Sequence, residues 1–172
     1  MINRLAHSIF VQSPDAVGNQ IFSYGVSTPT STAWPAANDA ILIPITIRFP
    51  CIAYRMWVVN GATASGNLDV GIYTEDGTRL VSIGSTAQSG TTALQFFNIT
   101  DTFLSPGNYY MACAMDGTTG TTRRHSPALE RCIAAGLIKG ATSFPLPATI
   151  TFATMTAAYI PQIGLDLTGL MT

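Results

Sequence analysis

The sequence has few charged residues, and their scarcity excludes several classes of protein. Asp, Glu, Lys and Arg make up 10% of the 172 residues and the formal net charge is -1, whereas ordinary soluble domains contain about 25% charged residues. The eight basic residues are scattered, and only Arg123 and Arg124 are adjacent. Because no basic stripe could follow a phosphate backbone, we expect no nucleic acid partner. A net charge so close to zero gives little self-repulsion, so we expect copies of the chain to associate.

Long apolar runs and metal-ligand motifs are also missing. No stretch approaches the roughly 20 apolar residues that span a bilayer, and the start MINRLAHSIF lacks the long apolar core of a signal peptide. We therefore expect synthesis in the cytoplasm and no membrane insertion. Cys51, Cys113 and Cys132 show no CxxC or Cys/His spacing, and an odd number cannot all pair within one chain. The sequence predicts buried free thiols, no metal ion and no cofactor.

Groups that could perform acid–base or nucleophilic catalysis are few. His7 and His125 are the only imidazoles; His7 lies in an irregular segment, and the two arginines before His125 disfavour its protonation. No serine lies in a GxSxG motif, and no DxDxDG calcium loop is present. Glu75 and Asp76 fall at the tip of a predicted hairpin, where Asp serves the turn geometry. The sequence therefore predicts a protein that is not an enzyme.

Short apolar strands and tight turns make up most of the chain. Residues 67–116 show them best: NLDVGIYT, the turn EDGT, RLVSIGS, and later the turn LSPG before NYYMACAMD. Alternation of apolar side chains predicts strands over residues 40–49, 67–74, 79–85, 93–100, 108–116, 149–154 and 158–167. The run IAYRMWVVNG, after the break at Pro50-Cys51, is apolar on both alternating faces and predicts a strand over residues 52–59 that is covered on both sides. Ser126 followed by Pro127 predicts an N-cap and one short helix that ends near Gly136. The pattern is typical of an all-β protein, an antiparallel β-sandwich or jelly roll with one short helix.

Residues 1–38 show no sustained period and include the Ser/Thr/Pro/Ala-rich segment STPTSTAWPAAND. We predict an extended N-terminal arm over residues 1–38 and a β-sandwich domain over residues 39–172. In this irregular segment Trp34 is expected to lie outside the core of its own chain and to anchor the arm to a neighbouring subunit. The segment DGTTGTTRR predicts a flexible loop in which Arg123 and Arg124 either pair with acids of a partner or are simply solvated.

Aromatic residues offer a second kind of site, because ring faces stack on sugars while Asn, Asp and Thr bind the hydroxyl groups. The alternative is that most of these rings lie inside strands and belong to the core. The residues concerned are Trp34, Trp57, Tyr24, Tyr73, Tyr109, Tyr110 and Tyr159. The triplet Asn98-Ile99-Thr100 matches a glycosylation motif but falls within a predicted strand, so we interpret it as structural.

Four segments of the chain resemble a group of β-sandwich proteins encoded by tailed bacteriophages. They are WPAANDAILIPITI, SGNLDVGIYTEDGTRLVSIGSTAQSGTTALQFFNIT, LSPGNYYMACAMD and SFPLPATITFATMTAAYIPQIGL, and together they cover most of residues 33–164. The motifs are turn and packing signatures and bring no catalytic residues.

The resemblance implies a non-enzymatic structural component located in the virion. Such an accessory protein, in head decoration or in the tail, would bind other virion proteins and copies of itself. The alternative is a host-attachment module that binds cell-surface glycans. We favour the accessory role, because the chain lacks the long repetitive or coiled-coil shaft of a fibre.

Overall fold

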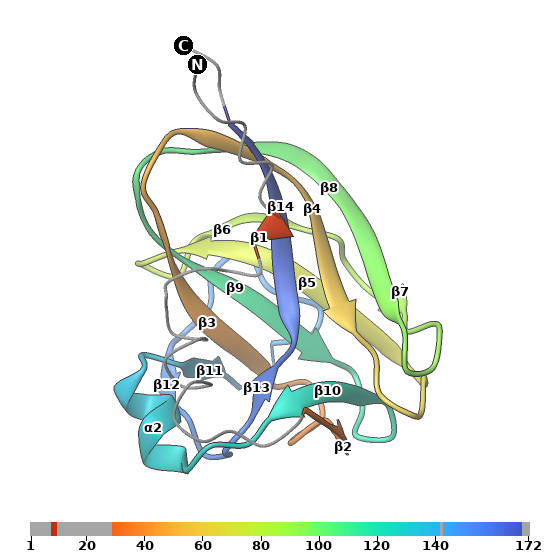
Figure 1. Ribbon diagram of the computed structural model, residues 1–172. Coiled ribbons are helices and arrows are strands. Elements are labelled where there is room, and N and C mark those ends of the chain that lie inside the picture. Colours follow the sequence, from red (N-terminus) through yellow and green to blue (C-terminus); the bar gives the residue numbers. More distant parts are fainter. Residues whose placement is uncertain (1–7, 10–28, 142, 170–172) are drawn as a thin grey trace.

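Antiparallel strands in three sheets make up the fold, as the sequence predicts (Figure 1). This computed structural model describes Ser8–Ile9, residues 29–141 and residues 143–169. Sheet A contains, in spatial order, β1 (Ser8–Ile9), β14 (Ile163–Gly169), β4 (Cys51–Val59) and β8 (Leu94–Leu104). Sheet B contains β13 (Ile160–Pro161), β10 (Thr121–His125) and β2 (Thr30–Ala33). Sheet C contains β12 (Ala153–Thr154), β11 (Ile138–Gly140), β3 (Ala40–Ile47), β9 (Gly107–Met115), β5 (Asn67–Thr74) and β6 (Arg79–Ser82), while β7 (Thr86–Ala87) pairs with β5.

The main core lies between sheets A and C, and the two faces of β9 show how the sequence builds it. Tyr109, Met111, Cys113 and Met115 point into this core together with residues of β4, β8 and β14. Successive residues of a strand point to opposite faces, so the intervening Ala112 and Ala114 enter a second, smaller core. That core lies on the other side of sheet C and also contains Leu42, Tyr73, Leu146 and Ile150. The predicted alternation along β9 is confirmed.

Pro44 shows why β3 tolerates a proline within a sheet. β3 pairs along its whole length with β9, and Pro44 lies opposite Tyr110. On the other side of β3, the strand β11 pairs only with residues Ala40, Ile41 and Leu42. Pro44 therefore lies beyond the end of β11, where its missing N–H removes no ladder hydrogen bond on that side.

The predicted hairpin at Asp76-Gly77 joins β5 to β6. The N–H of Thr74 donates to the carbonyl of Thr78 (2.9 Å), and the N–H of Gly77 donates to the carbonyl of Thr74 (3.1 Å). Gly77 has a φ of 86°, which glycine adopts without the steric penalty of a Cβ atom. The Asp76 carboxylate accepts from the Thr74 hydroxyl and from the Thr78 N–H, so its role here is in the turn, as predicted.

Two predictions around residue 120 are wrong. The segment predicted as a flexible loop contains β10, which pairs with both β2 and β13. These partners are distant in sequence, so the local run of Gly and Thr did not reveal them.

The helix α2 (Leu129–Ala134) begins after Ala128 rather than Ser126. The Ser126 hydroxyl instead donates to the carbonyl of Ala158 (3.1 Å), so it is not available as the N-cap. The helix does end near Gly136, whose φ is 79°.

Residues 29–38, the last part of the predicted arm, are integrated into the sandwich. β2 pairs with β10, and the N–H of Asn38 donates to the carbonyl of Met115 (2.8 Å). Apart from Ser8 and Ile9, the rest of the predicted arm lies outside the described residues.

Candidate functional site: an exposed aromatic face on sheet A

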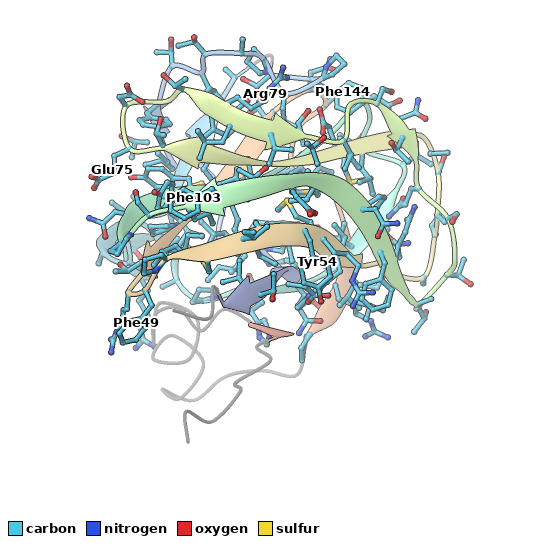
Figure 2. All side chains as sticks on the ribbon, turned by 90° about the horizontal axis from the view of Figure 1, so that it is seen from above. Phe49, Tyr54, Glu75, Arg79, Phe103 and Phe144 are labelled. Carbon is cyan, nitrogen blue, oxygen red and sulfur yellow. The ribbon has the colours of Figure 1, made fainter. Side chains whose placement is uncertain are left out.

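The outward side of sheet A carries most of the large apolar side chains that are exposed to solvent. Of seven such side chains among the described residues, five lie on β4, on β8 or in the turn before β4; Leu80 and Ile133 are the other two. We call this side the aromatic face. Figure 2 labels three of its rings: Phe49 in the turn before β4, Tyr54 on β4 and Phe103 on β8. It comprises Phe49, Ile52, Tyr54, Arg55, Trp57, Leu94, Phe96, Asn98, Phe103, Gly164 and Asp166.

Strand register explains why these side chains share one side. Trp57 lies opposite Phe96, and Ile52 lies opposite Phe103, whereas Met56 and Phe97, one residue along each strand, point into the main core. The register shifts between Ala53 and Arg55. This bulge turns two consecutive residues, Tyr54 and Arg55, to the outward side, as bulges commonly do.

The rings on this face are well exposed. Phe49 is 78% exposed, Phe103 57% and Phe96 50%. The largest exposed apolar patch of a monomeric protein is often a functional site, and patches larger than a few hundred Å² mark interaction sites. Because Phe96 and Phe103 lie on β8 and Phe49 lies in the turn before β4, the face is a surface suited to binding.

An ion pair lies across the middle of the aromatic face. The Nε and Nη2 atoms of Arg55 lie 2.6 and 2.5 Å from Oδ2 of Asp166, on the neighbouring strand β14. The Asp166 side chain is only 5% exposed. The guanidinium also lies over the ring of Phe96, 4.4 Å from its centroid, a cation–π geometry. The pair neutralises both charges and holds the guanidinium against the ring.

Trp57 lies on the aromatic face and packs against the neighbouring strand β14. Its indole lies over Gly164 so closely that a Cβ atom added to Gly164 would be 2.0 Å from Cζ2 of Trp57. Trp57 is only 6% exposed, although it points to the outward side of the sheet. Glycine at this position of β14 therefore permits the indole to pack against the neighbouring strand.

The structure corrects the expectation for Trp34, the first predicted interface residue. Trp34 is 1% exposed and belongs to the main core of its own chain. It packs edge-on against Tyr159, with ring centroids 5.3 Å apart, and its Nε1–H donates to the carbonyl of Asp39 (2.9 Å). The prediction that Trp34 lies outside its own core is wrong, because the pairing of β2 with β10 carries it inward.

Arg123 and Arg124 lie in β10 of sheet B, away from the aromatic face. Nη1 of Arg123 donates to the carbonyl of Pro29 (3.1 Å). Nη1 of Arg124 donates to the carbonyl of Ala158 (2.8 Å), and its guanidinium lies over the ring of Tyr159. Both arginines thus stabilise segments of their own chain, and a role in binding acids of a partner stays a prediction.

The rings proposed for a sugar platform do not assemble into one among the described residues. Five of them are at most 8% exposed. Trp34, Tyr73, Tyr109 and Tyr159 belong to the two cores, and Trp57 is buried on the outward side of sheet A. Tyr110 is partly covered by Phe152, whose ring centroid lies 5.1 Å away. Tyr24 lies outside the described residues. The alternative interpretation of these rings, as core residues, is confirmed for most of them.

Reactive side chains are buried or engaged in the part of the chain that the structure describes. Cys51, Cys113 and Cys132 are free and buried, as predicted, and burial raises the pKa of each thiol. His125 is buried in β10, and His7 lies outside the described residues. Across residues 29–141 and 143–169, no group of three His, Cys, Asp or Glu side chains could hold a metal ion. No helix within those ranges is long and apolar enough to cross a membrane.

A buried carboxylate lies on the opposite side of the sandwich, beneath a segment that we call the strap (residues 143–150). Asp69 is 0% exposed and accepts hydrogen bonds from the Leu146 N–H (2.9 Å) and the Ser82 hydroxyl (3.2 Å). Burial raises its pKa, although these hydrogen bonds oppose the shift. Arg79, whose guanidinium donates to the carbonyl of Leu146, lies at this side of the molecule in Figure 2, as does Phe144.

Sequence reasoning missed the exposed rings of the aromatic face. The signal was present in the consecutive pair Phe96-Phe97, because neighbours in a strand point to opposite sides. One ring must then leave the core unless both sides of the strand are covered. The run IAYRMWVVNG was interpreted as a strand covered on both sides, but Tyr54 is 37% exposed.

No protein-family model matches the sequence, and no curated protein sequence matches it.

Proposed function

We propose that this chain is a non-enzymatic structural protein that binds neighbouring protein subunits through its aromatic face. The observation that carries the proposal is the exposure of Phe49, Phe96 and Phe103 along one side of a sheet. Burial of apolar surface contributes about 25 cal/mol per Å², so a partner that covers these rings gains affinity without any reactive group. Aromatic residues are also enriched at the centres of protein interfaces.

The subunits that we propose as partners are those of a tailed-bacteriophage virion. This part of the proposal rests on the sequence resemblance of residues 33–164 to phage β-sandwich proteins. The low charge of the chain supports it, since a protein with 10% charged residues is poorly protected against association when free. Head decoration and a place in the tail both satisfy this role.

Purified particles test the proposal directly. Virus particles from cells that carry the gene should contain the chain at a fixed copy number by quantitative mass spectrometry. Immunogold labelling should then place it on the shell, for decoration, or on the tail. Particles that lack the chain would contradict the virion assignment.

A matched pair of variants tests the role of the aromatic face. Phe103→Asp should lower incorporation into particles at least about tenfold, because a charge replaces a ring at the proposed interface. Ile133→Asp changes a residue of similar type, 42% exposed on α2, and should incorporate normally. Equal incorporation of both variants would show that the aromatic face does not bind subunits.

Host attachment through glycans is the second candidate. The exposed Asn98 lies on β8 between Phe96 and Phe103, and rings beside an amide are an arrangement that binds sugars. The guanidinium of Arg55, however, already covers one side of the Phe96 ring. A glycan array probed with the purified protein distinguishes the two functions: a ligand lost in Asn98→Ala supports attachment, and an array without ligands excludes it.

A further inference from the structure

We infer that two copies of this chain pack against each other through their aromatic faces, related by a two-fold axis. The inference rests on the proposed function and names the partner: the first neighbour of each subunit is a second copy of itself. In such an isologous interface the same patch contributes on both sides.

The exposed area reaches the lower bound for a specific pair. A large side chain exposes about 200 Å² when fully accessible, so the exposed fractions of five apolar residues of the face amount to roughly 500 Å² per copy. These residues are Phe49, Tyr54, Leu94, Phe96 and Phe103. Two copies would bury about 1,000 Å² from these side chains alone, which is the lower bound for a specific interface. Their polar neighbours on the same strands would add to this area.

The charges on the face do not oppose a second copy. Arg55 and Asp166 already neutralise each other within one chain, and the Asp166 carboxylate is nearly buried. A facing copy therefore brings no unpaired charge from this pair to the interface. The net charge of -1 per chain adds little repulsion between copies.

The shape of β8 favours packing of the two faces over extension of the sheet edge. β4 is the only strand that pairs with β8 within the described ranges, so its other edge is open. The register runs from Asn98 opposite Arg55 to Thr102 opposite Ala53, which leaves three residues of β8 opposite one of β4. One of these three is the exposed Asp101. A bulge and a charge in the middle of an edge hinder continuous pairing with another edge, whereas they leave the rings on the face accessible.

The mass of the purified full-length chain in solution tests the inference. At about 100 µM, where a micromolar Kd leaves little monomer, light scattering coupled to size exclusion should give twice the chain mass. The double variant Phe96→Asp with Phe103→Asp should raise Kd at least about 100-fold and give a monomer. Ile133→Asp is the control and should remain a dimer. The single variant Phe103→Asp should weaken the dimer at least about tenfold, which keeps the test informative if the double variant does not fold.

Two results would overturn the inference. One is a wild-type chain that stays monomeric at this concentration; the other is an oligomer whose mass is unchanged in the variants of Phe103. These outcomes are separable from failure of the proposed function. A monomeric chain that is nevertheless present in particles refutes only the pairing of copies, and a dimer that is absent from particles refutes only the virion role.

Discussion

The main-chain N–H of Leu146 donates a 2.9 Å hydrogen bond to Oδ2 of Asp69, which lies 77 residues earlier in the sequence. The bond fastens the strap to the outer side of sheet C, where Tyr73 also donates to the carbonyl of Pro147 (2.6 Å). Oδ1 of Asp69 has no hydrogen-bond partner among the described residues. The strap is thus held by a fully buried carboxylate whose hydrogen bonds within the described residues all go to Oδ2.

This burial predicts a specific pH dependence for Asp69→Asn. Burial raises the pKa of Asp69 in the folded state above its ordinary value of 3.8. At a pH between the ordinary pKa and the folded-state pKa, the native state therefore binds more protons than the unfolded state. The free-energy cost of burying the ionised carboxylate is absent below the ordinary pKa and complete above the folded-state pKa. From pH 3.5 to pH 7 the wild type should lose stability relative to Asp69→Asn, by about 1.4 kcal/mol for each unit of pKa shift. Urea unfolding of both proteins across this range measures the difference.

Asp76→Asn is the control, and its sign should be opposite. The hydrogen bonds from Thr74 and Thr78 lower the pKa of the exposed Asp76 carboxylate. The stability that this carboxylate contributes is therefore present above its ordinary pKa and lost as the pH falls through the folded pKa. Parallel pH profiles for the two variants would contradict the assignment of the raised pKa to Asp69.

Replacement of Trp34 should destabilise the fold itself. Trp34→Ala removes a ring that is 1% exposed and packs against Tyr159, and truncation of a buried aromatic costs about 3–5 kcal/mol. Trp34→Phe keeps a ring in the core but loses the Nε1–H bond to the Asp39 carbonyl, so it should cost less. Equilibrium unfolding in urea measures both. An unfolding free energy of Trp34→Ala within 0.5 kcal/mol of the wild type, the range typical of exposed sites, would restore the predicted anchoring role.

A methyl group at residue 164 should disturb the aromatic face. Gly164→Ala places its Cβ 2.0 Å from the Trp57 indole, and the forced movement should cost about 1–3 kcal/mol. Gly117→Ala, where no atom lies within 4 Å of the added Cβ, should change stability by less than about 0.5 kcal/mol. In a Trp57→Leu background Gly164→Ala should cost much less, because the two residues are in contact. An equal cost in both backgrounds would mean that the indole is not the obstacle.

The three thiols should react only when the chain unfolds. Cys51, Cys113 and Cys132 are free and buried, and burial raises the pKa of each thiol, so the reactive thiolate is scarce and inaccessible. Labelling with iodoacetamide at pH 8 should be at least about 100-fold slower in buffer than in urea for all three. Mass spectrometry identifies each site. Rapid labelling of one cysteine in the native protein would show that its segment opens locally.

The all-β class, the strand at residues 67–74, the hairpin at Asp76-Gly77 and the two faces of β9 follow from the sequence alone. Each depends on neighbours a few residues apart, such as the alternation of Met111, Ala112 and Cys113 or a glycine at a turn. The burial of the three cysteines was predicted in the same way, from residue type and the absence of a ligand spacing. These local preferences survive in the folded protein because packing agrees with them.

Only the tertiary structure decided which faces are covered. Trp34 looked like part of an arm until the pairing of β2 with β10 brought it into the core, and Thr121–His125 looked like a loop for the same reason. Phe96 and Phe97 are equally apolar in sequence, yet one is 50% exposed and the other 6%. Arg55 forms an ion pair with Asp166, which lies 111 residues later in the sequence. The alternation of side chains along a strand predicts two faces of a sheet. Contacts between strands that are distant in sequence determine which face becomes core and which remains open to a partner.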